Sequence, residues 1–122
     1  MRDFRKYEVW QLAIDFATDI YAVANRLPVF EKYALSSQLC RAAISISSNI
    51  AEGAARSSEI EFCRFLEIAL GSSFEIETQL IIANRLDYID ATIFNELLQQ
   101  TQIIERKINQ LIQTIKKPIA NS

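Results

Sequence analysis

The sequence of 122 residues contains no histidine and has only two glycines, two prolines and two cysteines. Without histidine the chain lacks the usual general base near neutral pH, the Ser–His and Cys–His nucleophile pairs and the commonest metal ligand. Two glycines cannot build the Gly-rich phosphate loops of P-loop or dinucleotide-binding proteins. We therefore expect no catalytic residue, no enzymatic activity, no cofactor and no bound metal, and no small-molecule substrate is evident.

The same scarcity of turn formers bears on the fold class. An all-β sandwich or barrel needs a turn signal every ~8 to 12 residues, which two glycines and two prolines cannot supply. Half of the residues are apolar and 23% are charged, which is enough apolar material for one core. The composition predicts a single all-α domain over residues 1–122.

Charge and hydropathy indicate where such a domain works. There are 13 basic and 15 acidic side chains, so no global field attracts nucleic acid or anionic lipid. The longest apolar runs are far shorter than the ~20 residues that span a bilayer, and the polar start, residues 1–6, does not resemble a secretory signal. We expect a cytoplasmic protein without membrane contact, whose Cys40 and Cys63 are free thiols.

Apolar residues recur at helical spacing in four segments separated by breaks. Pro28 ends the first segment, Ser58 and Glu61 form a capping box before the third, and Asp90 can cap the fourth. The expected helices cover about residues 7–27, 33–55, 58–86 and 90–117, followed by a frayed tail, 118–122. Short loops between long helices predict an antiparallel up-down-up-down four-helix bundle.

The third segment is apolar over a wider arc than the ~100° that one bundle core requires. The first segment also carries two apolar faces. Because soluble monomers rarely expose such contiguous stripes, the pattern predicts self-association. The candidate interface residues are Cys63, Leu70, Phe74 and Ile81 in the third segment and Phe16, Ile20 and Val23 in the first. The alternative is an irregularly packed bundle whose extra apolar residues are scattered over the surface.

Glu77 falls within the apolar arc of the third segment, where a carboxylate must find a donor or become neutral. Arg41 in the second segment is the nearest basic residue at the same level. We expect these two side chains to form a buried polar pair that fixes one packing arrangement, and not to act as catalytic machinery.

One long motif resembles a known family. The run from Ser45 to Gly53 reads SISSNIAEG, and related matches continue from Arg56 through the segment EIETQL at residues 75–80. With weaker matches upstream they cover most of residues 7–90 and resemble the bacterial four-helix-bundle proteins, also called 23S ribosomal RNA intervening-sequence proteins. The chain departs from the family pattern at three positions, namely Cys40 for a basic residue, Ser47 for proline and Asp87 for glycine.

The resemblance implies a left-handed antiparallel bundle that assembles as a ring-like homopentamer. It also implies a gene within an insert of a bacterial 23S rRNA gene, or elsewhere in a bacterial chromosome, and no established enzymatic activity. The first functional hypothesis is therefore a non-enzymatic homo-oligomeric scaffold or adaptor whose partner is itself.

The second functional hypothesis is binding of ribosomal or other RNA through one end of the bundle. The predicted topology gathers basic side chains there, namely Arg2, Arg5, Lys6, Arg56, Lys116 and Lys117. Fivefold repetition would multiply this patch, and phosphate contacts are strongly salt-dependent. Acidic residues such as Glu59 lie near the same end, however, and basic residues at helix C-termini are ordinary dipole partners.

Overall fold

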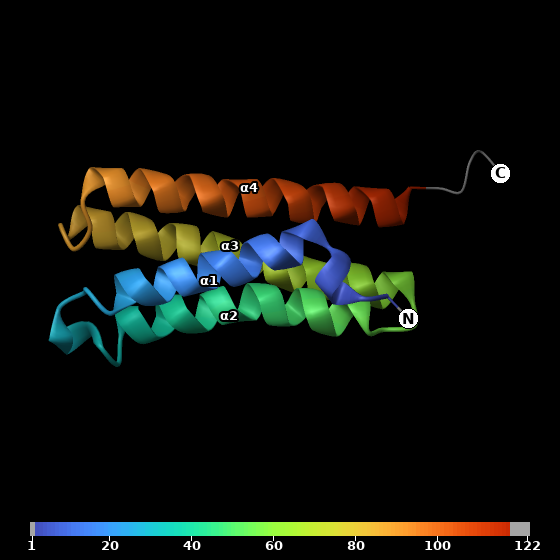
Figure 1. Ribbon diagram of the computed structural model, residues 1–122, viewed down its shortest axis with the longest axis horizontal. Helices are drawn as coiled ribbons and strands as arrows, with labels where there is room; N and C mark the ends of the chain where they lie inside the picture. The colour runs from blue at the N-terminus through green and yellow to red at the C-terminus, as the bar shows by residue number, and fades with distance from the viewer. Residues whose placement is uncertain (1, 118–122) are drawn as a thin grey trace.

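A computed structural model describes residues 2–117 and places four long helices side by side (Figure 1). They are α1 (Glu8–Ala24), α2 (Leu35–Ala54), α3 (Glu59–Arg85) and α4 (Ala91–Lys116), and two short 3-10 helices, η1 (Phe4–Lys6) and η2 (Val29–Glu31), precede α1 and α2. No strand occurs within the described range, so the all-α prediction is confirmed. The expected frayed tail, 118–122, lies outside the described residues.

The helices form a four-helix bundle, as predicted. α1 packs against α2 and α4, and α3 packs against the same two helices, so α1 and α3 occupy opposite corners. Figure 1 shows consecutive helices running in opposite directions. Ion pairs agree with this, because Lys107 late in α4 contacts Glu8 at the start of α1, and Lys116 lies 3.6 Å from Glu67 early in α3. The left-handed sense of the bundle stays a prediction.

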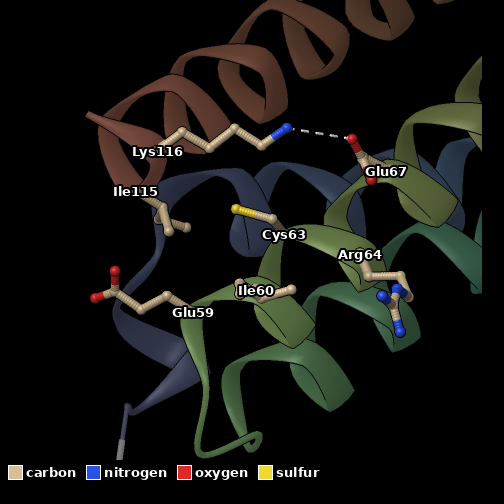
Figure 2. A pocket seen from close by; sticks show the side chains of 7 residues that line it. All are labelled: Glu59, Ile60, Cys63, Arg64, Glu67, Ile115 and Lys116. Atoms are coloured by element: carbon tan, nitrogen blue, oxygen red, sulfur yellow. Dashed lines mark ion pairs between the residues drawn. The ribbon is translucent and has the colours of Figure 1, made fainter. Parts of the chain in front are cut away.

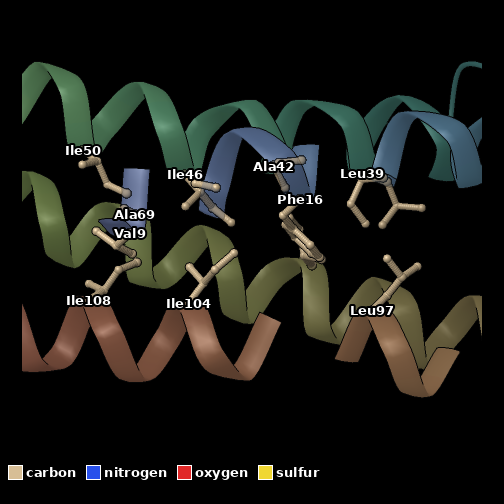
Figure 3. Packing of buried hydrophobic residues seen from close by; sticks show 14 of the residues in the cluster. Val9, Phe16, Leu39, Ala42, Ile46, Ile50, Ala69, Leu97, Ile104 and Ile108 are labelled. Carbon is tan, nitrogen blue, oxygen red and sulfur yellow. The ribbon is translucent and has the colours of Figure 1, made fainter. Parts of the chain in front are cut away.

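The core is a continuous column of hydrophobic, mostly aliphatic side chains along the bundle axis (Figure 3). In α4 the buried positions are spaced three or four residues apart, at Leu97, Thr101, Ile104, Ile108 and Ile112. Each fully buried large aliphatic side chain contributes roughly 1.5 to 3 kcal/mol relative to an exposed one. Thr101 is tolerated in this row because its hydroxyl donates to the Leu97 carbonyl at 2.7 Å.

Helix ends follow the sequence signals in part. The Ser58 hydroxyl accepts from the Glu61 amide at 3.1 Å, and Asp90 accepts from the Ile93 amide at 2.8 Å, as the caps predict. α1 ends at Ala24, earlier than predicted, because the chain tightens into turns there, with the Arg26 amide donating to the Val23 carbonyl at 2.9 Å and the Leu27 amide to the Ala24 carbonyl at 3.3 Å. Asp87 adopts a left-handed φ of 60° after α3, a conformation that glycine adopts more readily than other residues.

Gly53 sets the distance between α2 and α3. Gly53 lies next to the end of α2 at Ala54, but its φ is not positive, so its importance lies in close packing and not in a left-handed helix end. A Cβ atom added there would lie 2.7 Å from the Phe65 Cβ and 3.0 Å from a ring carbon of Phe62. Further along the seam, the Ser45 and Ser72 hydroxyls are 2.7 Å apart. Gly71 differs from Gly53, because a Cβ there would meet nothing within 4 Å.

Substituting each glycine by alanine tests this assignment. Gly53→Ala should lower the free energy of unfolding by about 1 to 2 kcal/mol, since the Phe65 Cβ is fixed to its backbone and the helices must separate. Gly71→Ala should raise it by about 0.5 to 1 kcal/mol through helix propensity alone. Urea unfolding followed by circular dichroism measures both, and equal effects would contradict the close-packing role of Gly53.

Candidate functional site

The basic residues at one end of the bundle are the first candidate site. The chain start, the turn between α2 and α3 and the end of α4 all lie at this end (Figure 1). Arg2 donates from Nη1 to the Arg56 carbonyl at 2.7 Å and to the Ala54 carbonyl at 3.5 Å, and its guanidinium lies 4.7 Å from the centre of the Phe62 ring. Arg2 thus occupies the C-terminus of α2, where unpaired carbonyls and the helix dipole favour a cation.

Other cations at this end also have partners within the subunit. Arg56 lies 4.7 Å above the Phe65 ring, and Arg5 pairs with Asp3 at 3.1 Å while lying over Phe4. Lys6 and Lys117 are exposed. The sequence predicts these residues at one end of the bundle. The structure brings Arg2 and Arg56 together there, and several of the positive charges make contacts within the subunit.

Lys116 belongs to a shallow groove between α3 and α4 at the same end (Figure 2). The groove has a volume of about 270 Å³, and its lining residues are Glu59, Ile60, Cys63, Arg64, Glu67, Ile115 and Lys116. Cys63 lies at its base with 5% of its surface exposed. Burial raises the pKa of the Cys63 thiol, so the thiol stays protonated near neutral pH and is a poor nucleophile.

Residues 2–117 contain no group of three or more Cys, Asp or Glu side chains placed to hold a metal ion. Cys40 and Cys63 are both free, as expected. None of the helices in this range has the length and hydrophobicity needed to cross a membrane.

The predicted interface is only partly on the surface, and this is a correction. Phe16, Ile20, Val23 and Cys63 are between 0 and 7% exposed within one subunit, so they belong to its core and offer no surface to a second copy. The second apolar faces of α1 and α3 exist because each helix packs against two neighbours. Leu70 is half-buried, whereas Phe74 and Ile81 are 49% and 37% exposed and remain candidates.

Besides the predicted interface, the structure has a second apolar surface that was not predicted from the sequence. It surrounds a groove of about 520 Å³ between the end of α1 and the start of α2, and it includes Tyr21, Val29 and Tyr33. Val29 and Tyr33 are 88% and 87% exposed. Because these residues lie in the loop around Pro28, a search for helical stripes could not find them. The available signal was three large apolar or aromatic residues, Val29, Phe30 and Tyr33, within a five-residue loop.

The expected pair between Arg41 and Glu77 is wrong. Arg41 is exposed on α2 and takes part in none of the ion pairs among residues 2–117. Glu77 lies half-buried on the side of α3 that faces α4, beside Glu105. The error arose because the α4 side of α3 cannot be told from its α2 side on a helical wheel.

Removing the Arg2 side chain tests whether this cation stabilises the end of α2. Arg2→Ala should lower the free energy of unfolding by about 1 kcal/mol, because it removes the contact with Phe62 and the bonds at the end of α2. The exposed Lys6 provides the control, and Lys6→Ala should change stability by less than about 0.5 kcal/mol. Thermal unfolding measures both variants, and an Arg2→Ala protein as stable as the unaltered chain would contradict the capping role.

The chain is similar to known proteins in sequence and in fold. The family described as "23S rRNA-intervening sequence protein" matches residues 5–110. Among solved structures, the chain is similar to a protein of unknown function from the S23 ribosomal protein family of Bacteroides thetaiotaomicron. The identity is 26% and the TM-score 0.81, over 86% of this chain and 95% of the other. The chain matches none of the curated proteins.

Proposed function

Because the chain belongs to the 23S rRNA-intervening sequence protein family, we propose that it acts as a non-enzymatic homo-oligomer, a cytoplasmic scaffold or adaptor built from bundle subunits. Five copies in a ring is the assembly that the family resemblance implies. The observation that supports the proposal most strongly is the amount of apolar surface that a single subunit leaves in water.

The exposed apolar residues form two different surfaces. The α1–α2 surface comprises Tyr21, Val29 and Tyr33 around their groove, and the α3 stripe comprises Phe74 and Ile81 with half-buried Leu70. Phe74 and Ile81 are seven residues apart and therefore share one face of α3. Large exposed apolar patches on a soluble subunit mark interaction sites.

The positions of these surfaces favour a ring over a two-fold dimer. The α1–α2 edge and the α3–α4 edge lie on opposite sides of the bundle, since α1 and α3 each pack against both α2 and α4. A two-fold dimer joins the same patch on both copies, whereas two unlike patches on opposite sides suit head-to-tail contacts. Head-to-tail contacts close into a ring when the rotation between subunits allows it.

Charged substitutions on the two surfaces test the assembly. Phe74→Glu and Tyr33→Glu should each reduce the mass measured by light scattering, while circular dichroism shows unchanged helicity because both side chains are exposed in the subunit. Gln110→Glu places the same charge on an exposed position of α4 outside both surfaces and should leave the mass unchanged. An undiminished mass for Phe74→Glu and Tyr33→Glu would show that these surfaces do not hold the assembly together.

RNA binding is a second candidate, favoured by the basic residues on the segments that meet at one end of the bundle, namely the chain start, the turn between α2 and α3 and the end of α4 (Figure 1). Of those cations, Lys6 and Lys117 are exposed and take part in none of the ion pairs among residues 2–117. A ring would repeat their charges in each subunit, and binding carried by phosphate contacts falls steeply with salt.

A filter-binding series with a structured ribosomal RNA fragment tests this second candidate. Binding should be measurable at ~50 mM salt and at least about tenfold weaker at ~200 mM. The double variant Lys6→Ala and Lys117→Ala should weaken it, whereas Arg85→Ala, at an exposed residue in the last turn of α3 at the other end of the bundle, should not. No binding by the unaltered protein at ~50 mM salt would eliminate the candidate.

A further inference from the structure

The α3–α4 seam contains two carboxyl groups that approach each other without a donor between them. Glu77 Oε1 and Glu105 Oε2 are both shielded from solvent, and neither has a hydrogen-bond partner. Two carboxylates can only accept hydrogen bonds, whereas one protonated carboxyl can donate to the other. The missing partner of this pair is therefore a single proton.

The neighbouring groups do not supply a permanent substitute for that proton. The Ser73 hydroxyl, on α3, has one hydrogen, which goes either to the Leu70 carbonyl at 2.6 Å or to Glu105. Arg106 is the nearest cation on α4, and it is exposed. From the α1 side, Glu8 engages Lys107, the next cation along α4. None of the ion pairs within residues 2–117 includes Glu77 or Glu105.

Electrostatics agrees with this geometry. Burial, followed by the close approach and the negative charge of Glu77, raises the pKa of Glu105 from 4.5 to about 7, while Ser73 and Arg106 oppose the shift only in part. When two carboxyl groups share one site, the first proton to leave departs readily and the second is retained to a much higher pH.

We propose that Glu77 and Glu105 share one proton and act as a pH-sensitive latch that holds α4 against α3. With the proton present, the carboxyl of one residue donates to the carboxylate of the other across the seam. When the proton leaves for solvent near neutral pH, two negative charges face each other and the seam is weakened. This inference concerns contacts within a subunit and does not rest on self-association.

The sign of the pH dependence follows from the raised pKa of Glu105. Between about pH 4.5 and pH 7 the folded chain retains a proton that the unfolded chain has lost. The stability contributed by the latch is therefore fully present below pH 4.5 and is lost as the pH rises through 7. Most paired carboxylates give the opposite slope, because their pKa values are lowered by folding.

Urea unfolding between pH 5 and pH 8 tests the latch when Glu105→Gln is compared with the unaltered protein. The glutamine amide donates to Glu77 at every pH, so the variant should have a higher midpoint urea concentration at pH 8 and lack the decline between pH 5 and 8. Glu96→Gln, at an exposed position on the same helix, should keep the decline of the unaltered protein. Identical pH profiles for Glu105→Gln and the unaltered protein would overturn the proposal.

A direct titration keeps the test valid if Glu105→Gln fails to fold. The carboxyl carbon of Glu105 in the unaltered chain, followed by NMR, should titrate near pH 7, and an apparent pKa near 4.5 would overturn the latch. Repeating the urea series in the Tyr33→Glu background distinguishes the latch within a subunit from the proposed self-association. A pH dependence that persists after the oligomer has dissociated belongs to the subunit, whereas one that disappears contradicts a latch within it.

Discussion

Most of the structure depends on α3 having to pack against two helices at once. On one side, Gly53 lets α2 approach until its backbone lies against Phe62 and Phe65. On the other side, Cys63, Leu70 and Glu77 follow one another at intervals of seven residues along the edge that faces α4. A helix fixed in this way cannot rotate to bury Phe74 or Ile81, which remain partly in water. The same constraint inserts a carboxyl group into the seam, where it meets Glu105.

The fold was largely predictable from the sequence, because it depends on local signals. The 3.6-residue spacing and the Ser58 and Asp90 caps locate the helices, and short connections make neighbours in sequence neighbours in space. The assignment of apolar residues to core or surface was less predictable. Phe16 and Ile20 form a stripe beside another apolar stripe, and only the positions of α2 and α4 reveal that one subunit buries both.

Details that depend on long-range geometry could not be predicted from one chain. Glu77 required a partner, but its partner lies on α4, and nothing local indicates which face of α4 meets α3. The role of Gly53 depends on two phenylalanines of another helix. The basic end was located correctly, but the internal contacts of Arg2 and Arg56 depend on carbonyls and rings that only the folded chain brings within reach.

These observations favour apolar association over charge as the basis of function. Several cations at the basic end are engaged by Asp3, by Glu67 or by aromatic rings of the same subunit. The apolar surfaces at Tyr33 and Phe74, by contrast, have no cover within the described residues. Exposed apolar surface of this kind favours burial against another protein surface. Because the two patches are unlike and lie on opposite sides, each subunit can bind one neighbour through its first patch and a second neighbour through its other patch.

Sedimentation equilibrium of the unaltered protein over a wide concentration range measures its self-association without any substitution. We expect a species several times the 13.9 kDa of one chain, with five copies as the expected number. A single 13.9 kDa species that persists at the highest concentration would contradict it, because the surfaces around Phe74 and Tyr33 would then be stable in water without a partner copy.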